Sequence, residues 1–127
     1  NIVIGGIDSE KTYFVERVTT NQFKTALEYA VNIKSILEIY NIAISQVEGA
    51  IVSSVVPPLN ATIASAVKKI FGFRPMIVGA GMTAETVREQ LAFSDGAIVG
   101  SYFKEGGITE YPVDEERVKK FMHNVRV

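Results

Sequence analysis

Residues 49–81 read GAIVSSVVPPLNATIASAVKKIFGFRPMIVGAG, and this stretch decides the fold. Its first part, GAIVSSVV (49–56), is a short β-branched run of the kind that is buried in a parallel sheet. The two prolines that follow open a helix, lysines lie near its end, and Gly72 ends it. A second apolar strand, PMIVGAG (75–81), comes next. The order strand, helix, strand predicts two parallel strands joined by a right-handed crossover.

The N-terminal flank predicts a β-hairpin followed by a long helix. NIVIGGI (1–7) and TYFVERVTT (12–20) are short apolar or alternating runs, and the polar segment DSEK separates them. Between Asn21 and Asn41 the apolar side chains recur every three or four residues. This spacing gives a helix one broad apolar face, which must pack against a core.

The C-terminal flank predicts two more helices and one more strand. Thr83 is the expected N-cap of a helix over 83–93, and DGAIVGSYF (95–103) is the next strand. A last helix starts near Asp114, with acidic residues at its positive end and basic residues toward its negative end. We therefore predict one α/β domain over residues 1–127, with helices on both faces of a sheet in three layers.

The composition is that of an ordinary soluble globular domain, and it argues against several classes of function. Of the 127 residues, 47% are hydrophobic and 21% are charged, and the 14 acidic residues are nearly balanced by 13 basic ones. Without a basic stripe the chain is not expected to bind nucleic acid. No cysteine is present, and no apolar run approaches the about 20 residues of a membrane span. The N-terminus lacks the pattern of a signal peptide, so we expect a cytoplasmic protein without membrane contact.

Residues 1–79 resemble the type III pantothenate kinases, which have an actin-like, ribonuclease-H-like fold. The resemblance is carried by NIVIGGID, by TALEYAV (25–31) and above all by the block SSVVPP (53–58) with the helix and strand that follow it. In that family an acid-x-Gly-Asn-Thr-Asn loop handles the nucleotide phosphates and the metal, and Asn1 corresponds to its last residue. The family pattern places a first strand and this acid before Asn1 and a substrate-binding half after Gly79, and we expect both to be absent from this chain, which argues against kinase activity.

Residues 75–127 are similar instead to the C-terminal end of the BtpA family, whose members are (βα)8 barrels. The matching features are the glycine loop with Thr83, the strand SDGAIVGS (94–101) with Lys104, and the tail YPVDEERVKKFM (111–122). The two resemblances overlap on PMIVG (75–79). We interpret the chain as a chimera of the two families, joined at this strand, of engineered or natural origin.

Two strand orders are compatible with this interpretation. When the strands are numbered 1 to 5 along the chain, the preferred order of the five-stranded, mostly parallel sheet is 2-1-5-3-4, with one antiparallel strand. In this order strand 95–103 takes the central place of the strand that would precede Asn1, and its apolar residues are buried. The alternative order, 2-1-3-4-5, adds this strand at the edge.

The two glycine loops are the candidate ligand site. In (βα)8 barrels the last two strand ends often hold phosphate with backbone N–H groups and a helix N-terminus. The BtpA resemblance places such a phosphate or sulfate site on two loops, whose residues are Gly79, Ala80, Gly81, Thr83, Gly100 and Ser101. The other interpretation is that these residues only form turns, and the order 2-1-5-3-4 would separate the two loops.

The remaining polar residues favour structural roles. Asp8 and Asp95 are expected in turns, and Glu28 on a helix surface or bonded to the sheet end. Ser53 and Ser54 lack a neighbouring histidine, and no spacing of acids with the single histidine, His123, suggests a metal site. We therefore expect no catalytic residue, metal or cofactor.

Three functions remain as hypotheses. The preferred one is a recombined α/β scaffold without enzymatic activity. The first alternative is a binder of phosphate or of a phosphorylated small molecule, and the second is a fragment of a type III pantothenate kinase. A homodimer is expected as well, because a chain built from parts of two folds would leave apolar surface exposed.

Overall fold

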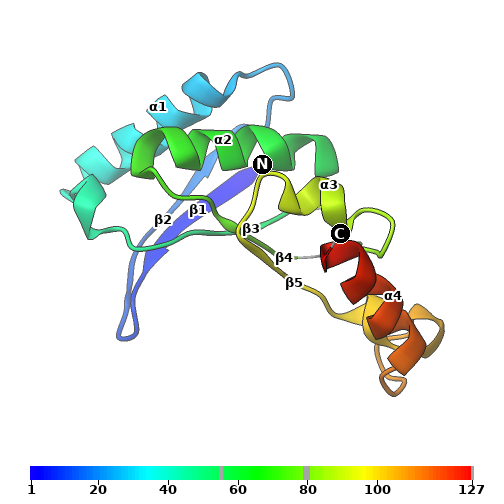
Figure 1. Cartoon of the computed structure of the whole chain (residues 1–127). Helices are drawn as coiled ribbons and strands as arrows, with labels where there is room; N and C mark the ends of the chain where they lie inside the picture. Colours follow the sequence, from blue (N-terminus) through cyan, green and yellow to red (C-terminus); the bar gives the residue numbers. More distant parts are fainter. Residues whose placement is uncertain (55, 79–80, 127) are drawn as a thin grey trace.

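The computed structural model describes residues 1–54, 56–78 and 81–126 (Figure 1). Strands β1 (Ile2–Ile7) and β2 (Thr12–Val18) form the predicted antiparallel hairpin. Its turn depends on Asp8, whose Oδ1 accepts hydrogen bonds from the N–H groups of Glu10 and Lys11 at 2.8 and 2.9 Å. Asp8 is therefore a turn residue, as its position between two apolar runs predicts.

Helix α1 (Ala26–Ile39) follows the hairpin and starts at a capping box. The Thr25 hydroxyl accepts from the Glu28 N–H, and the Glu28 carboxylate accepts from the Thr25 N–H at 2.6 Å. Tyr29, only 1% exposed, anchors the chain before the helix: its hydroxyl accepts from the Asn21 N–H and donates to the Asn21 carbonyl. The helix begins five residues after the predicted start, because the cap lies at Thr25 and not at Asn21.

The stretch 49–81 forms the predicted strand, helix and strand. Strand β3 (Ile51–Ser53) leads through helix α2 (Pro57–Phe71) to strand β4 (Met76–Val78), which pairs with β3 in parallel. Gly72 ends α2 with a φ of 78°, and the Lys68 ammonium donates to the Gly72 carbonyl at 2.7 Å. The prolines, the late lysine and the terminal glycine thus act as expected.

Strand β5 (Gly96–Ile98) pairs in parallel with β4, so the smaller sheet has the order β3-β4-β5. The preferred order 2-1-5-3-4 is therefore not confirmed, since β5 lies at the edge and not between β1 and β3. Within this sheet the neighbours are those of the alternative order, but the pairing of β1 with β3 that this order also requires is not found among the described residues. The single five-stranded sheet is not confirmed either, because among the described residues β1 and β2 form a sheet of their own. Consecutive parallel strands with a short crossover usually become neighbours, which explains the position of β5.

The segment between β4 and α4 is less regular than predicted. Helix α3 spans only Val87–Leu91, and after β5 the chain forms two 3-10 turns, η2 (Ser101–Phe103) and η3 (Glu105–Gly107). A third such turn, η1 (Ile44–Gln46), follows α1. Helix α4 (Glu115–Arg126) starts where predicted, with the Asp114 carboxylate accepting from the N–H groups of Glu116 and Arg117.

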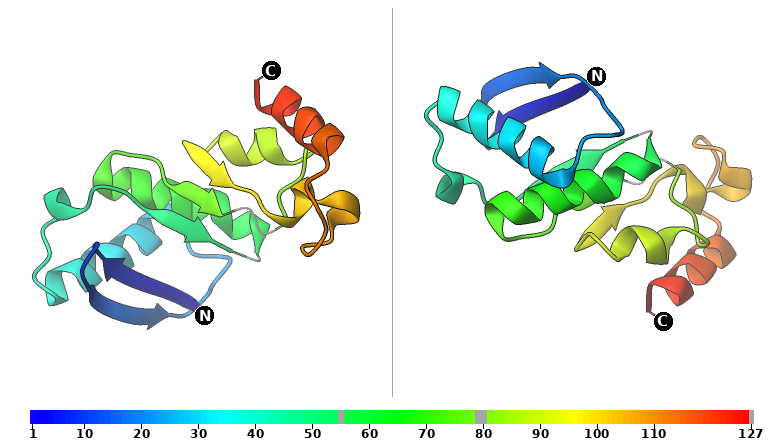
Figure 2. Two further views of the ribbon diagram at one scale, coloured as in Figure 1. Left: turned by 90° about the horizontal axis from the view of Figure 1, so that it is seen from below. Right: turned by 90° about the horizontal axis from the view of Figure 1, so that it is seen from above.

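The helices lie on one side of the strands. Figure 1 shows α1 and α2 above the strands, and Figure 2 shows the hairpin and α4 at opposite ends of the molecule. On that side α1 and α2 share a cluster around Tyr29 and Ala66, and Ile77 of β4 packs with α3 and α4. On the other side Ile51, Met76 and Ile98 are exposed. A third layer is thus not observed within the described ranges, and the α/β class itself is confirmed.

Candidate functional site

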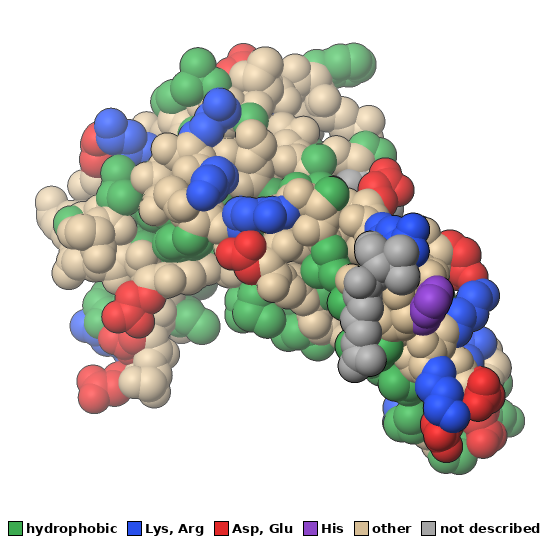
Figure 3. All heavy atoms as spheres, in the orientation of Figure 1, with side chains coloured by type: hydrophobic (Ala, Val, Ile, Leu, Met, Phe, Trp, Pro, Cys, Tyr) green, Lys and Arg blue, Asp and Glu red, His purple; other side chains and the backbone are tan. Residues whose placement is uncertain are grey.

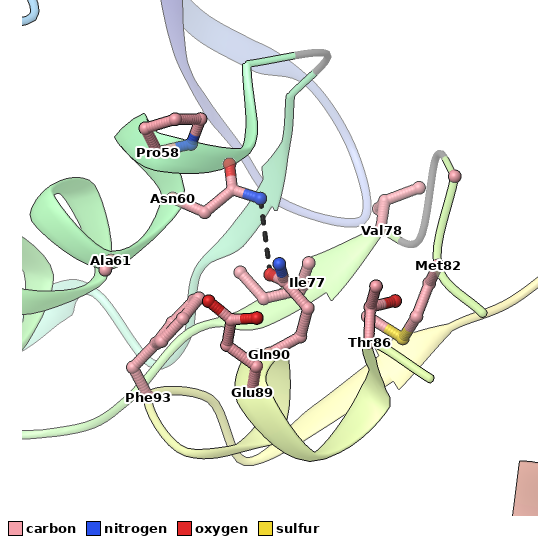
Figure 4. A pocket seen from close by; sticks show the side chains of 11 residues that line it. Pro58, Asn60, Ala61, Ile77, Val78, Met82, Thr86, Glu89, Gln90 and Phe93 are labelled. Carbon is pink, nitrogen blue, oxygen red and sulfur yellow. Dashed lines mark hydrogen bonds between the residues drawn. The ribbon is translucent and has the colours of Figure 1, made fainter. Parts of the chain in front are cut away.

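A pocket of about 450 Å³ lies between α2, the carboxyl end of β4 and α3 (Figure 4). Ile77 and Val78 of β4 lie between the two helices that form its walls. The remaining lining residues are Pro58, Asn60, Ala61, Gly81, Met82, Thr86, Glu89, Gln90 and Phe93. The pocket has a size that is ordinary for small-molecule sites, and the carboxyl end of a parallel strand is where α/β proteins bind ligands.

Asn60 and Gln90 connect the two walls of the pocket. The Asn60 side chain points from α2 toward α3, and its Nδ2 donates to Gln90 Oε1 at 3.4 Å (Figure 4). Asn60 is only 6% exposed. Its Oδ1 has no hydrogen-bond partner among the described residues. A buried acceptor without a hydrogen-bond partner is uncommon in folded proteins, so the Asn60 side chain is an unusual feature of this pocket.

The two glycine loops leave neighbouring strands. Val78 at the end of β4 pairs with Ile98 at the end of β5, so both loops start at the same edge of the sheet. Gly81 lines the pocket and has a φ of 78°, which favours glycine. Gly79 and Ala80 lie outside the described residues. Gly100 and Ser101 are exposed at the start of η2, where the Gly100 carbonyl accepts from the Phe103 N–H.

Thr83 has a structural role in the loop before α3. Its hydroxyl accepts from the Thr86 N–H at 3.3 Å, and its own N–H donates to the Thr86 hydroxyl at 3.0 Å. The N–H of Val87 donates to the Thr83 carbonyl. Thr83 therefore caps a turn, and α3 begins only at Val87, four residues after the predicted start. The prediction of a helix over 83–93 is wrong in length, because this turn replaces its first part.

The same loop contains Glu85, whose pKa is the most strongly shifted among the acidic groups of the described residues. The ammonium group of Lys120 on α4 donates to the Glu85 carboxylate at 2.6 Å. This bond, with smaller contributions from the Glu85 N–H and the Thr83 hydroxyl, lowers the pKa of Glu85 to about 2. Both side chains are 61% exposed, so we assign the pair a role in orienting α4 and little weight in stability.

The other polar residues named from the sequence do not gather at the pocket. Arg74 forms an ion pair with Asp95 at 3.6 Å, and the Ser54 hydroxyl binds the backbone of Val56. Lys104 pairs with Val113 in an isolated β-bridge. His123 is exposed on α4 among charged side chains, as Figure 3 shows. Within the described ranges no three His, Asp or Glu side chains form a group that could hold a metal ion.

Sequence reasoning missed Asn60 as a site residue. In the sequence, Asn60 stands at helical spacing with Ala64 and Val67. The structure buries all three side chains, with exposures of 6%, 2% and 5%. A polar residue on an otherwise apolar helix face is a candidate for a specific hydrogen bond or a ligand contact. Gln90 gives no comparable signal, since its meeting with Asn60 depends on how α3 packs against α2.

The architecture defines an α/β protein with a small-molecule-sized pocket at the carboxyl end of a parallel strand. The chain belongs to the BtpA family, whose sequence model matches residues 42–127. It is also similar to proteins named type III pantothenate kinase. The relative from Finegoldia magna is 44% identical over 78 residues, which cover 61% of this chain and 30% of that protein. The relative from an Exiguobacterium species is 38% identical over 82 residues, or 65% of this chain and 32% of that protein.

A third relative shows that the kinase similarity extends along most of the chain. The type III pantothenate kinase from Bifidobacterium animalis is 35% identical over 113 residues, which cover 84% of this chain and 45% of that protein. The chain thus spans about a third of the length of the first two relatives and less than half of the third. Both resemblances are confirmed, and they overlap over much more than residues 75–79. The comparisons do not support an engineered or recombined origin.

The same comparisons contradict the expectation that the chain is a scaffold without enzymatic activity. Relatives that are 35–44% identical over a large part of this chain are named as kinases. The prediction relied on residues that the family motif places before Asn1, and a chain that spans only part of its relatives gives no basis for that argument. As a separate finding, none of the helices in residues 1–54, 56–78 and 81–126 is long and apolar enough to cross a membrane.

Proposed function

We propose that the protein to which this chain belongs is a type III pantothenate kinase, which transfers a phosphoryl group from ATP to pantothenate. The observation that carries the proposal is the 44% identity over 78 residues to a protein of that name. The Bifidobacterium relative adds support because its similarity covers 84% of the chain. The chain spans about a third of the length of the first two relatives, so the activity is proposed from their names and not from a complete site in this chain.

The described residues would supply the framework of such an enzyme. Phosphoryl transfer depends on positioning the reactants and on placing cations and hydrogen-bond donors around the phosphates. The hairpin begins at Ile2, directly after the position that matches the end of the family's phosphate loop. Its inner face packs on α1 through Phe14, Ile36 and Leu37. This packing would hold the end of that loop in place, and the chemistry itself would come from residues outside the described ranges.

The test is a segment exchange with the Finegoldia magna relative. Residues 2–78 of this chain replace the equivalent segment of that protein, and the hybrid is assayed for ATP-dependent phosphorylation of pantothenate by mass spectrometry. We expect phosphorylated pantothenate to form at a rate within about a hundredfold of the parent, which corresponds to less than about 3 kcal/mol of lost transition-state stabilisation. Reactions without ATP are the control. A folded hybrid that forms no product while the parent is active would contradict the proposal.

A second candidate function is the binding of phosphate or of a phosphorylated small molecule at the glycine loops. One observation favours it: β5 pairs with β4, so the two loops start side by side and are not separated by β3. Glycine at these positions would let backbone N–H groups approach an anion closely. The short helix α3 adds little to this, since its first turn is already capped by Thr83 and Thr86.

Phosphate titration monitored by amide NMR tests this candidate on the chain itself. We expect saturable shifts of the loop amides when phosphate is added at constant ionic strength. The amides concerned are those of Gly79, Ala80, Gly81, Thr83, Gly100 and Ser101. Chloride at the same ionic strength is the control, because a nonspecific effect of salt appears with either anion. Shifts that chloride reproduces, or shifts spread over the whole chain, would rule out a site in these loops.

A further inference from the structure

The outer face of α1 carries apolar side chains that no described element covers. The inner face of the helix packs on the hairpin and on α2 through Tyr29, Ile36 and Leu37. Leu27 and Val31 lie one turn apart on the opposite face, and they are 63% and 54% exposed. In the view from above, no other described element lies over α1 (Figure 2). The helix therefore presents a short apolar ridge to solvent.

The charged residues beside this ridge alternate in sign along the chain. Lys24 comes just before the helix. Glu28, Lys34 and Glu38 follow it on the exposed side of α1, each within about 60° of the direction of Val31 around the helix axis. An antiparallel copy of this helix presents the charges in the reverse order, so that positive side chains meet negative ones. A parallel copy in register would place like charges together, which is unfavourable.

A single two-fold axis at Val31 satisfies these charges. When Val31 lies opposite the partner's Val31, Glu28 lies opposite the partner's Lys34. At the ends of the contact, Lys24 lies opposite the partner's Glu38. The hydrogen bond from the backbone N–H that precedes α1 lowers the pKa of Glu28, so this carboxylate is charged at neutral pH. A surface that is complementary to itself in this way is what a two-fold symmetric dimer requires.

The same axis brings apolar side chains together. Leu27 lies opposite the partner's Ser35, whose small side chain allows the two helices to approach closely. Phe23 just before the helix and Ile39 at its end are both exposed, and in this register each lies opposite the other. The contact therefore removes apolar surface from water at its centre and at both ends.

We propose that this face of α1 binds the same face of a second copy of the chain, with the two helices antiparallel and related by a two-fold axis at Val31. Helix α1 has 14 residues and is about 21 Å long, so the contact is smaller than the interface of a stable dimer. We therefore expect a weak homodimer, with a Kd on the order of 100 μM. This interface is independent of the proposed kinase activity.

Sedimentation equilibrium of the whole chain, at concentrations from about 10 μM to about 1 mM, measures the Kd of the dimer. Val31→Glu places two carboxylates at the two-fold axis and should raise the Kd at least about tenfold. Because Val31 is exposed, its circular dichroism spectrum should stay that of the unmodified chain. Ile98→Glu introduces the same charge at an exposed apolar residue of β5 and should leave the Kd unchanged.

Two charge variants test the antiparallel register. Lys24→Glu combined with Lys34→Glu makes the face negative, and Glu28→Gln combined with Glu38→Lys makes it positive. The change Glu28→Gln keeps a side chain that can complete the capping box of α1. Each variant alone should dimerise more weakly than the unmodified chain, because like charges meet. A mixture of the two should form a heterodimer at least as tightly as the unmodified chain forms its homodimer.

Three results would overturn this interface. A chain that remains monomeric at about 1 mM would show that α1 does not bind a second copy. A dimer that Ile98→Glu disrupts and Val31→Glu does not would place the contact on the open side of the sheet. Charge variants that dimerise alone as tightly as in their mixture would exclude the antiparallel register. If Val31→Glu does not fold, the charge variants and their mixture still decide the question.

Discussion

Replacement of Phe121 by alanine is expected to lower the free energy of unfolding by about 3–5 kcal/mol. Phe121 is the buried aromatic residue of α4, with 4% exposure. Its ring centroid lies 5.0 Å from that of Phe103, edge to face, and 5.8 Å from that of Tyr102. It also packs in the cluster that contains Ile77 and Val87. The loss combines the transfer of the ring from the core, the cavity left behind and the lost aromatic contacts.

Urea denaturation followed by circular dichroism measures the change, and hydrogen exchange locates it. We expect the amides of α4 to lose protection first, because this helix packs on the rest of the chain mainly through Phe121 and its neighbours. His123→Ala, an exposed change on the same helix, is the control and should alter stability by less than about 0.5 kcal/mol. An equally small effect of Phe121→Ala would mean that α4 does not depend on this core.

Ile77→Ala is expected to lower the free energy of unfolding by about 2–5 kcal/mol. Ile77 is 2% exposed in the central strand β4, where it pairs with Val52 of β3 and Ala97 of β5. It lies at the centre of the cluster that joins the sheet to α3 and α4, and it also lines the pocket. A cavity at this position cannot collapse easily, because paired strands flank it on both sides.

Met76→Ala is the matched control for Ile77→Ala. Met76 precedes Ile77 in the same strand but faces the other side of the sheet, where it is 41% exposed. Its loss should be clearly smaller in the same urea denaturation experiment, because less apolar surface returns to water. Equal losses at the two positions would mean that both faces of β4 are buried in solution, for example by a second copy of the chain or by the rest of a longer protein.

Local signals in the sequence predicted the elements well. Gly72 ends α2, Asp8 forms the hairpin turn and Asp114 caps α4, each through hydrogen bonds within a few residues. The lengths were predicted less well. Strand β5 covers only the start of the predicted strand 95–103, and α3 covers less than half of 83–93. In both segments local turns of the backbone replaced part of the regular element, and hydrophobic periodicity does not distinguish such turns.

The candidate site could be predicted only in part. Gly81 does line the pocket, so the glycine loop after β4 was a useful indication. Asn60 was missed although it lies on the apolar face of α2, and its bond to Gln90 could not be predicted because it depends on how α3 packs against α2. The function was misjudged for a different reason. The expectation of no enzymatic activity depended on residues that the family motif places before Asn1, and the similarity to kinases over 84% of the chain overturns that expectation.

The sequence by itself determined the type and order of the elements, the helix ends and the α/β class. These depend on side-chain periodicity and on hydrogen bonds between neighbouring residues, which can be read along the chain. Only the tertiary structure decided that β5 pairs with β4, that the hairpin forms its own sheet, and that Asn60 meets Gln90 across a pocket. The physical reason is that several strand orders bury nearly the same apolar residues, so their energies differ through long-range packing and backbone pairing that no local pattern records.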